Sequence, residues 1–174
     1  MMTKQSFTPF WTHVREMNGI AMRLVEQLPA DKIDATPITG MRTVKELVTH
    51  MYGTVVKATT LGITTGEIKL PDDKALMATM KNKEDVVRFC RDCWSAADTA
   101  AATITDAQLS ATVKTPWGMD MPGWMCAGVV LDEFVHHRGQ LYCFLRALGA
   151  KEVPMMWDFE HNAPEYRSKA TTTV

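Results

Sequence analysis

The sequence has no excess of charge of either sign and no long hydrophobic run. In 174 residues, 19 lysines and arginines stand against 20 aspartates and glutamates. Such a balance creates no field that would attract nucleic acid or an anionic membrane surface. No apolar run approaches the length of about 20 residues that spans a bilayer, and residues 1–6 contain no apolar signal segment. We therefore expect a cytoplasmic protein that binds neither nucleic acid nor membrane.

Cysteine is scarce, and four cysteines in a chain of this size do not indicate a disulfide framework. Cys90 and Cys93 form a C-x-x-C pair, a spacing found in redox motifs and in half of a zinc site. A reactive pair usually opens a helix, where the helix dipole lowers the thiol pKa. These two cysteines lie well inside a helical run, and no second C-x-x-C occurs. We expect them to pack in the core as small hydrophobic side chains.

Apolar residues, at 46 % of the chain, recur at steps of three and four in four stretches. This spacing is typical of helices with one buried face, and it predicts helices at 9–28, 43–60, 82–105 and 122–148. Thr8 and Pro9 are suited to begin the first helix, as its N-cap and its first residue. Thr43 and Glu46 match a capping box at the start of the second helix.

Long connections separate the expected helices. Residues 29–42 and 62–81 are polar or mixed and contain prolines, and residues 111–121 predict a short extended ribbon with a tight turn. No stretch is typical of a core strand. The sequence therefore predicts an all-α fold, a four-helix bundle with long inter-helix connections. We expect one domain over residues 1–167, followed by a loose tail at 168–174.

The fourth expected helix carries an unusual pair of side chains. At about 100° per residue, His137 lies near the middle of the apolar stripe and Glu133 lies about 40° to one side. Burying an unpaired charge is costly, so an inward carboxylate and imidazole need a partner, and a metal ion would satisfy both. Two ordinary alternatives remain: an i,i+4 ion pair on a helix surface, and a core histidine with a single hydrogen bond.

The other histidines give weaker signals. His50 borders the apolar stripe of the second helix, and His13 flanks the stripe of the first, whereas His136 points about 100° away from His137. Helical bundles build metal sites from side chains on facing helices. The inward candidates are His50 with Glu133 and His137. Because only one Glu/His helical pair occurs, we do not expect a dinuclear carboxylate site.

With these residues placed, the sequence resembles the DinB/YfiT-like family of four-helix metalloproteins over roughly residues 7–149. The strongest similarity is His-Arg-Gly-Gln-Leu at 137–141, which continues into Leu-Arg-Ala-Leu-Gly at 145–149. The segment Glu-Leu-Val-Thr-His-Met at 46–51 is similar to the family's second-helix histidine motif. The resemblance implies a bundle that binds one divalent metal ion.

The resemblance also implies the ligands of that ion, which fall on His50, Glu133 and His137. The family's fourth-helix pair is usually H-x-x-x-H, and Glu133 stands in place of the first histidine. A mononuclear site then has two imidazoles and one carboxylate. Zinc is the favoured metal. Nickel, iron and manganese stay as alternatives, because these ions respond differently to the exchange of an imidazole for a carboxylate.

Two hypotheses for the function follow. Three protein ligands leave an open position, as in catalytic zinc sites, and characterised relatives include transferases and isomerases that use low-molecular-weight thiols. The open position would thus activate a small thiol, as an S-transferase or isomerase does, or water, as a hydrolase does. Alternatively, the protein is a non-catalytic, metal-stabilised bundle, a stress-related binding or dimerisation module. The candidates for groups that support the ligands are His13, Tyr52, His136 and Arg138.

Methionine and tryptophan are plentiful. Thirteen methionines and five tryptophans exceed what the core of one small bundle needs, and relatives in the resembled family often pair. We therefore expect a homodimer that buries part of one face of the bundle.

Overall fold

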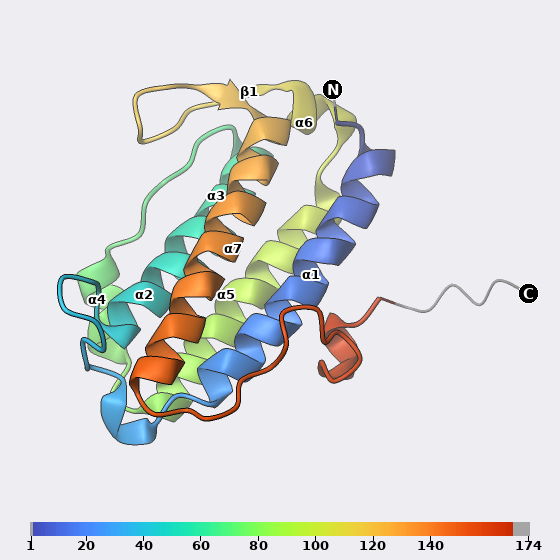
Figure 1. Ribbon diagram of the computed structural model, residues 1–174. Coiled ribbons are helices and arrows are strands. Elements are labelled where there is room, and N and C mark those ends of the chain that lie inside the picture. Colours follow the sequence, from blue (N-terminus) through green and yellow to red (C-terminus); the bar gives the residue numbers. More distant parts are fainter. Residues whose placement is uncertain (1, 169–174) are drawn as a thin grey trace, which may run out of the picture.

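A computed structural model describes residues 2–168. Four long helical segments lie side by side (Figure 1): α1 (Lys4–Glu26), the continuous run α2 (Val44–Thr49), η2 (His50–Ala58) and α3 (Thr59–Thr65), then α5 (Lys83–Thr103) and α7 (Gly123–Ala147). Shorter helices occupy the connections: η1 (Ala30–Lys32), α4 (Asp73–Thr79), α6 (Asp106–Ser110) and η3 (Pro164–Tyr166). Strands β1 (Thr112–Val113) and β2 (Met121–Pro122) pair antiparallel ahead of α7. The predicted all-α, four-helix architecture is confirmed.

Helix α1 begins at Lys4, earlier than the start at Pro9 that the sequence pattern indicated. The Thr3 side chain accepts a hydrogen bond from the Ser6 backbone N–H, and the Ser6 side chain accepts one from the Thr3 N–H. This capping box satisfies the free donors of the helix end, and the buried Phe7 anchors the first turns in the core. The predicted start at Thr8 and Pro9 is therefore wrong, and Pro9 lies inside the helix.

The second helical run begins as predicted and continues past its predicted end. Thr43 and Glu46 form the capping box, with the Glu46 N–H donating to Thr43 Oγ1 at 3.1 Å and the Thr43 N–H to Glu46 Oε2 at 2.7 Å. The run ends at Gly66, whose φ of +83° is the left-handed conformation that glycine adopts readily. Its middle, η2, is a π-helix with i→i+5 hydrogen bonds, so the 3.6-residue pattern does not hold there.

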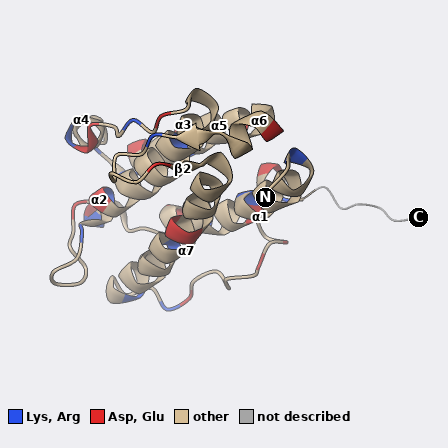
Figure 2. Ribbon diagram, turned by 90° about the horizontal axis from the view of Figure 1, so that it is seen from above, with Lys and Arg blue, Asp and Glu red and all other residues tan. Residues whose placement is uncertain are grey.

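One hydrophobic core lies between the four helical segments. Cys90 and Cys93 are buried free thiols in this core, as predicted, and burial raises the pKa of Cys93 to about 11. Acidic and basic residues are interspersed along the helices (Figure 2). Within residues 2–168, no helix is long and apolar enough to cross a membrane.

The chain after α7 turns back along α1. Gly149, which follows the end of this helix, has a φ of +95°, the left-handed conformation that glycine adopts readily. Beyond it, Asp158 forms an ion pair with Arg23 of α1 at 2.7 Å, and the Asn162 side chain donates to the Glu16 carbonyl at 2.8 Å. The segment after α7 is thus fixed to α1 by polar contacts. Of the predicted loose tail, residues 169–174 lie outside the described part of the chain.

Removing the cap at Thr43 should destabilise the run that carries His50. In Thr43→Ala the Glu46 N–H loses its acceptor, and the loss of such a cap costs about 1 kcal/mol of unfolding free energy. Thr43→Ser keeps the hydroxyl and should unfold at nearly the urea concentration of the unchanged chain. Urea unfolding followed by circular dichroism measures both variants, and equal destabilisation by the two would contradict the role of the hydroxyl.

Candidate metal centre

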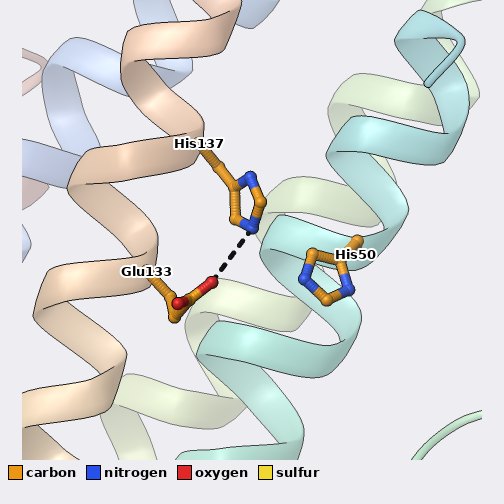
Figure 3. Close-up of side chains that lie close together, drawn as sticks. All are labelled: His50, Glu133 and His137. Carbon is orange, nitrogen blue, oxygen red and sulfur yellow. Dashed lines mark ion pairs between the residues drawn. The ribbon is translucent and has the colours of Figure 1, made fainter. Parts of the chain in front are cut away.

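The second helical run and α7 bring three ligand-type side chains together (Figure 3). His50 is the first residue of η2, whereas Glu133 and His137 lie one turn apart on α7, and the possible ligand atoms all fall within 4.8 Å of one another. His137 Nε2 lies 3.3 Å from Glu133 Oε2. Two ligand atoms of a tetrahedral zinc shell are about 3.4 Å apart. The spacing within this group therefore suits a single ion.

The three side chains differ in exposure. His137 is 3 % exposed and His50 is half-buried, whereas 49 % of the Glu133 side chain is exposed. The helical periodicity predicted a Glu133 that points into the core, and the structure places this carboxylate at the solvent edge instead. The group consequently runs from the interior of the bundle to its surface, so a small molecule can approach it from the Glu133 side.

A hydrogen-bonded chain on α7 orients the ring of His137. His137 Nδ1 lies 2.9 Å from Gln140 Oε1, and the amide nitrogen of Gln140 lies 3.1 Å from His136 Nε2. Because an amide oxygen only accepts, His137 Nδ1 carries the proton and donates it. In the neutral ring, Nε2 then keeps its lone pair. Metal-binding histidines are commonly fixed in this way by an acceptor on the other ring nitrogen.

The Nε2 atom of His137 is buried and has no hydrogen-bond partner among the described residues. Glu133 is near enough for an ion pair but does not have the geometry of a hydrogen bond. Because the proton of His137 is on Nδ1, the lone pair of its Nε2 faces the Glu133 carboxylate with no proton between the two atoms. A buried acceptor is costly unless it has a hydrogen-bond donor or a cation as its partner. One cation would be the partner of both His137 Nε2 and the Glu133 carboxylate. The residues therefore fit a divalent metal ion.

Both imidazoles are in the form that binds metal. Burial, reinforced by the nearby His137 and Arg42, lowers the pKa of His50 to about 4. Burial also lowers the pKa of His137 from its usual value, although its hydrogen bond to Gln140 and the charge of Glu133 act in the opposite direction. Near pH 7 the two rings are neutral, and their nitrogen lone pairs are available to a cation.

Of the four residues predicted to support the ligands, only His136 connects to them in the structure, through Gln140. Tyr52 is buried in the core and its hydroxyl donates to Asn18 at 3.0 Å. Arg138 is also buried, and its guanidinium lies against a methionine sulfur of α1. His13 stacks on Trp157 of the C-terminal segment. These three side chains make their contacts away from the metal group.

Sequence reasoning did not identify Gln140 as a supporting residue. The signal was present, because Gln140 follows His137 by three positions and side chains at that spacing meet on a helix. Arg42 was also missed. It lies just before the N-cap of α2 and so outside the helix, where helical spacing does not connect it with the histidines.

A pocket of about 340 Å³ adjoins His50 and Glu133. Its walls are mostly apolar and come from the second helical run, α7 and the ribbon that precedes α7. The remaining lining residues are Thr54, Val55, Thr59, Trp117, Met119, Met121 and Val129. A separate pocket of about 290 Å³, lined in part by Gly53 and Cys93, contains none of the three ligand candidates. The pocket beside His50 is therefore the one that adjoins the candidate metal ligands.

A second group of potential ligands, Asp158, Glu160 and His161, lies on the surface of the C-terminal segment. Asp158 already pairs with Arg23, and both Glu160 and His161 are exposed. Exposed groups of this kind keep their hydration, so they provide no reason for an ion to bind. This group offers a useful control for the buried one.

Replacing His137 should abolish metal binding, since it is the most buried of the three ligand candidates. Equilibrium dialysis against Zn²⁺, followed by elemental analysis, should find one ion per chain in the unchanged protein and none in His137→Ala. His161→Ala should retain the ion, and Glu133→His should also retain it because an imidazole replaces the carboxylate. Retention of the ion by His137→Ala, or its loss from His161→Ala, would show that the ion binds elsewhere.

Removing the acceptor of Gln140 should weaken the site without removing a ligand. Gln140→Leu frees the His137 ring and should lower the affinity for Zn²⁺ by roughly 10–100-fold. Gln140→Glu keeps an oxygen acceptor for Nδ1 and should preserve the affinity. Competition with a chromophoric chelator measures the three dissociation constants, and an unchanged value for Gln140→Leu would exclude an orienting role.

The comparisons with known proteins concern the family and the fold. The DinB family matches residues 1–168. A DinB-like protein from Bacillus subtilis, YjoA, shares the fold with a TM-score of 0.67 at 18 % identity, over 81 % of this chain and 92 % of that one. YfiT from Bacillus subtilis shares the fold with a TM-score of 0.65 at 18 % identity, over 86 % of this chain and 91 % of that one. It is described as a probable metal-dependent hydrolase with an unusual four-helix bundle topology.

No curated protein sequence matches the chain. The two solved structures therefore establish the fold of the chain. The family to which it belongs is established by the family match, which covers nearly the whole chain. The family match over residues 1–168 shows that this chain belongs to the DinB family.

Proposed function

We propose that this chain is a metal-dependent enzyme that binds one divalent ion through His50, Glu133 and His137 and uses it to activate a small thiol. The observation that carries the proposal is the buried, unpartnered Nε2 of His137, which faces the Glu133 carboxylate at the edge of an apolar pocket. A bound divalent ion lowers the pKa of a thiol or of water and so supplies a nucleophile near neutral pH.

The ligand set favours a catalytic over a structural role. Structural zinc sites are closed by four protein ligands, whereas catalytic sites have three and keep one position open. Two histidines with one glutamate is a ligand set of known catalytic zinc sites, so zinc is the favoured ion, with nickel, iron and manganese as alternatives. Glu133 is exposed and lines the pocket, so the open coordination position of a bound ion would face the pocket. A non-catalytic, metal-stabilised module would need neither feature.

The pocket suits an apolar substrate. Its volume of about 340 Å³ is at the lower end of the usual range for small-molecule sites. The side chains of Trp117 and Met119 are 49 % and 62 % exposed, so they present apolar surface at its mouth. A substrate between these residues would lie beside His50 and Glu133, shielded in part from water.

Thiol transfer suits the lining better than hydrolysis does. Apart from His50 and Glu133, no acid or base is among the described residues that line the pocket. Attack by a thiolate on an electrophilic carbon requires no further proton donor when the leaving group is a stable anion. Hydrolysis of an amide or an ester with a poor leaving group does require one. Activation of water is the second candidate, because the similar YfiT is described as a probable hydrolase.

The test is a paired assay on the Zn²⁺-loaded protein. Low-molecular-weight thiols are offered with a chloronitroarene, and nitrophenyl esters are offered without thiol. We expect thiol-dependent turnover that is lost with chelator, restored by Zn²⁺ and absent in His137→Ala. Trp117→Ala should raise KM more than it lowers kcat, because this residue contacts the substrate away from the reacting atoms.

Ester turnover without thiol would instead favour the hydrolase. If neither reaction exceeds the rate with free Zn²⁺ while the protein retains its ion, the enzyme proposal fails and the non-catalytic module stands.

A further inference from the structure

We infer that the pocket between the second helical run and α5 is a second small-molecule site, and that it binds an apolar molecule with one carboxylate. The pocket has a volume of about 290 Å³ and has no described residue in common with the pocket beside His50. Its walls come from η2, α3, the connection that follows α3, α4 and α5. None of the three metal-ligand candidates lines it, so this inference does not rest on the proposed function.

The outer wall of this pocket is fixed to the rest of the fold. In Figure 1 the connection after α3 runs beside the second helical run. The Ile68 N–H donates to the Lys114 carbonyl at 2.9 Å, and the Lys114 N–H donates to the Gly66 carbonyl at 2.9 Å. A Cβ at Gly62 would lie 2.4 Å from Ile68 Cγ1, so this glycine lets the connection pack directly on α3. The pocket is therefore formed before any ligand binds, as most small-molecule sites are.

The inner surface of the pocket is apolar. Gly53 leaves space in the wall that η2 forms, because a Cβ there would meet Leu76 Cδ1 and Phe89 Cζ, each at 3.4 Å. Leu76 of α4 and Phe89 of α5 are large apolar side chains, yet they are only half-buried. The buried Cys93 completes this part of the wall. A ligand with an apolar body would remove this surface from water, which favours binding.

Four polar side chains line the same pocket, and one of them has no partner. The Thr65 hydroxyl lies 3.1 Å from the carbonyl oxygens of Leu61 and Glu67, so its proton is already used. Glu67 pairs with Lys69 at 3.7 Å. Lys57 is exposed and forms no ion pair or hydrogen bond with the described residues. The lining therefore has one uncompensated positive charge, which suits a ligand with a single negative charge.

Lys57 lies where it can bind the charged end of such a ligand. Burial raises the pKa of Cys93 and the Lys57 charge acts in the opposite direction, so the ammonium lies near the Cys93 wall. Asp92, next to Cys93 in the chain, is exposed and does not line the pocket. A carboxylate on Lys57 makes a charge-assisted hydrogen bond and leaves the apolar body against Leu76 and Phe89. A phosphate monoester carries a charge of about −1.5 to −2, more than Lys57 alone compensates.

A titration of the full-length, Zn²⁺-loaded chain with octanoate tests the site. Followed by amide signals in nuclear magnetic resonance, octanoate should shift Gly53 and Gly62 and leave Trp117 in place. Octanol should bind about tenfold more weakly, because it cannot form the charge-assisted contact with Lys57. Octylammonium should bind more weakly still, since Lys57 repels it. Octanol that binds as tightly as octanoate, or shifts confined to the pocket beside His50, would overturn the inference.

Three variants test the residues that carry the inference. Lys57→Met keeps the apolar stem and should weaken octanoate binding about tenfold. Lys74→Met makes the same change of charge on α4 outside the pocket, and it should bind octanoate like the unchanged chain. Gly53→Ala should also weaken binding, because its methyl group takes up space in the pocket.

The Gly53→Ala variant contains its own control for folding. Alanine is the better helix former, so its urea midpoint should not fall while its affinity for octanoate does. Equal losses in Lys57→Met and Lys74→Met would show that only the overall charge matters. That result, or an unchanged affinity in Gly53→Ala, would contradict the proposed site.

Discussion

The arrangement of the site depends on one buried lone pair. His137 lies inside the bundle with its Nδ1 proton committed to Gln140, so its Nε2 faces the Glu133 carboxylate without a proton to share. In a protein interior such an acceptor is costly unless it is satisfied. The remaining features of the site supply what that atom requires: a second neutral imidazole at His50, a carboxylate at the solvent edge, and space for a small molecule beside them.

The fold determines where that atom can be satisfied. The capping box at Thr43 fixes the start of the second helical run, and the run carries His50 to the neighbourhood of α7. At His50 the run becomes a π-helix, a geometry that is rare and often occurs at functional sites. The ribbon before α7 then adds Trp117 and Met119 over the pocket. A rigid scaffold of helices thus presents a site whose outer wall comes from a connection, the part of a fold that varies most easily.

Helix α7 presents different kinds of residue on its two sides. Its inner side presents His137 and the core residues, whereas its outer side is mixed, with Asp132, His136 and Arg146 exposed beside Met125 and Val135. The hydrogen-bonded chain from Gln140 to His136 runs from the inner side toward the outer one, so the support of the metal ligands ends at the exposed His136.

The sequence by itself determined the four helical segments, because apolar periodicity and capping residues act locally, and it pointed to His137 because a histidine in an apolar stripe is visible in the chain. The Thr8 and Pro9 start failed because an N-cap at Thr3 and burial of Phe7 outweigh a proline in the second turn. The same periodicity indicated Glu133 and left His50 as a candidate at the border of the second stripe, and the family resemblance joined the three as ligands of one ion. Only the tertiary structure decided that these side chains meet, that Glu133 lies at the surface, and that Tyr52, His13 and Arg138 face elsewhere. Those outcomes depend on how one helix is rotated against another, and packing of the whole core sets that rotation.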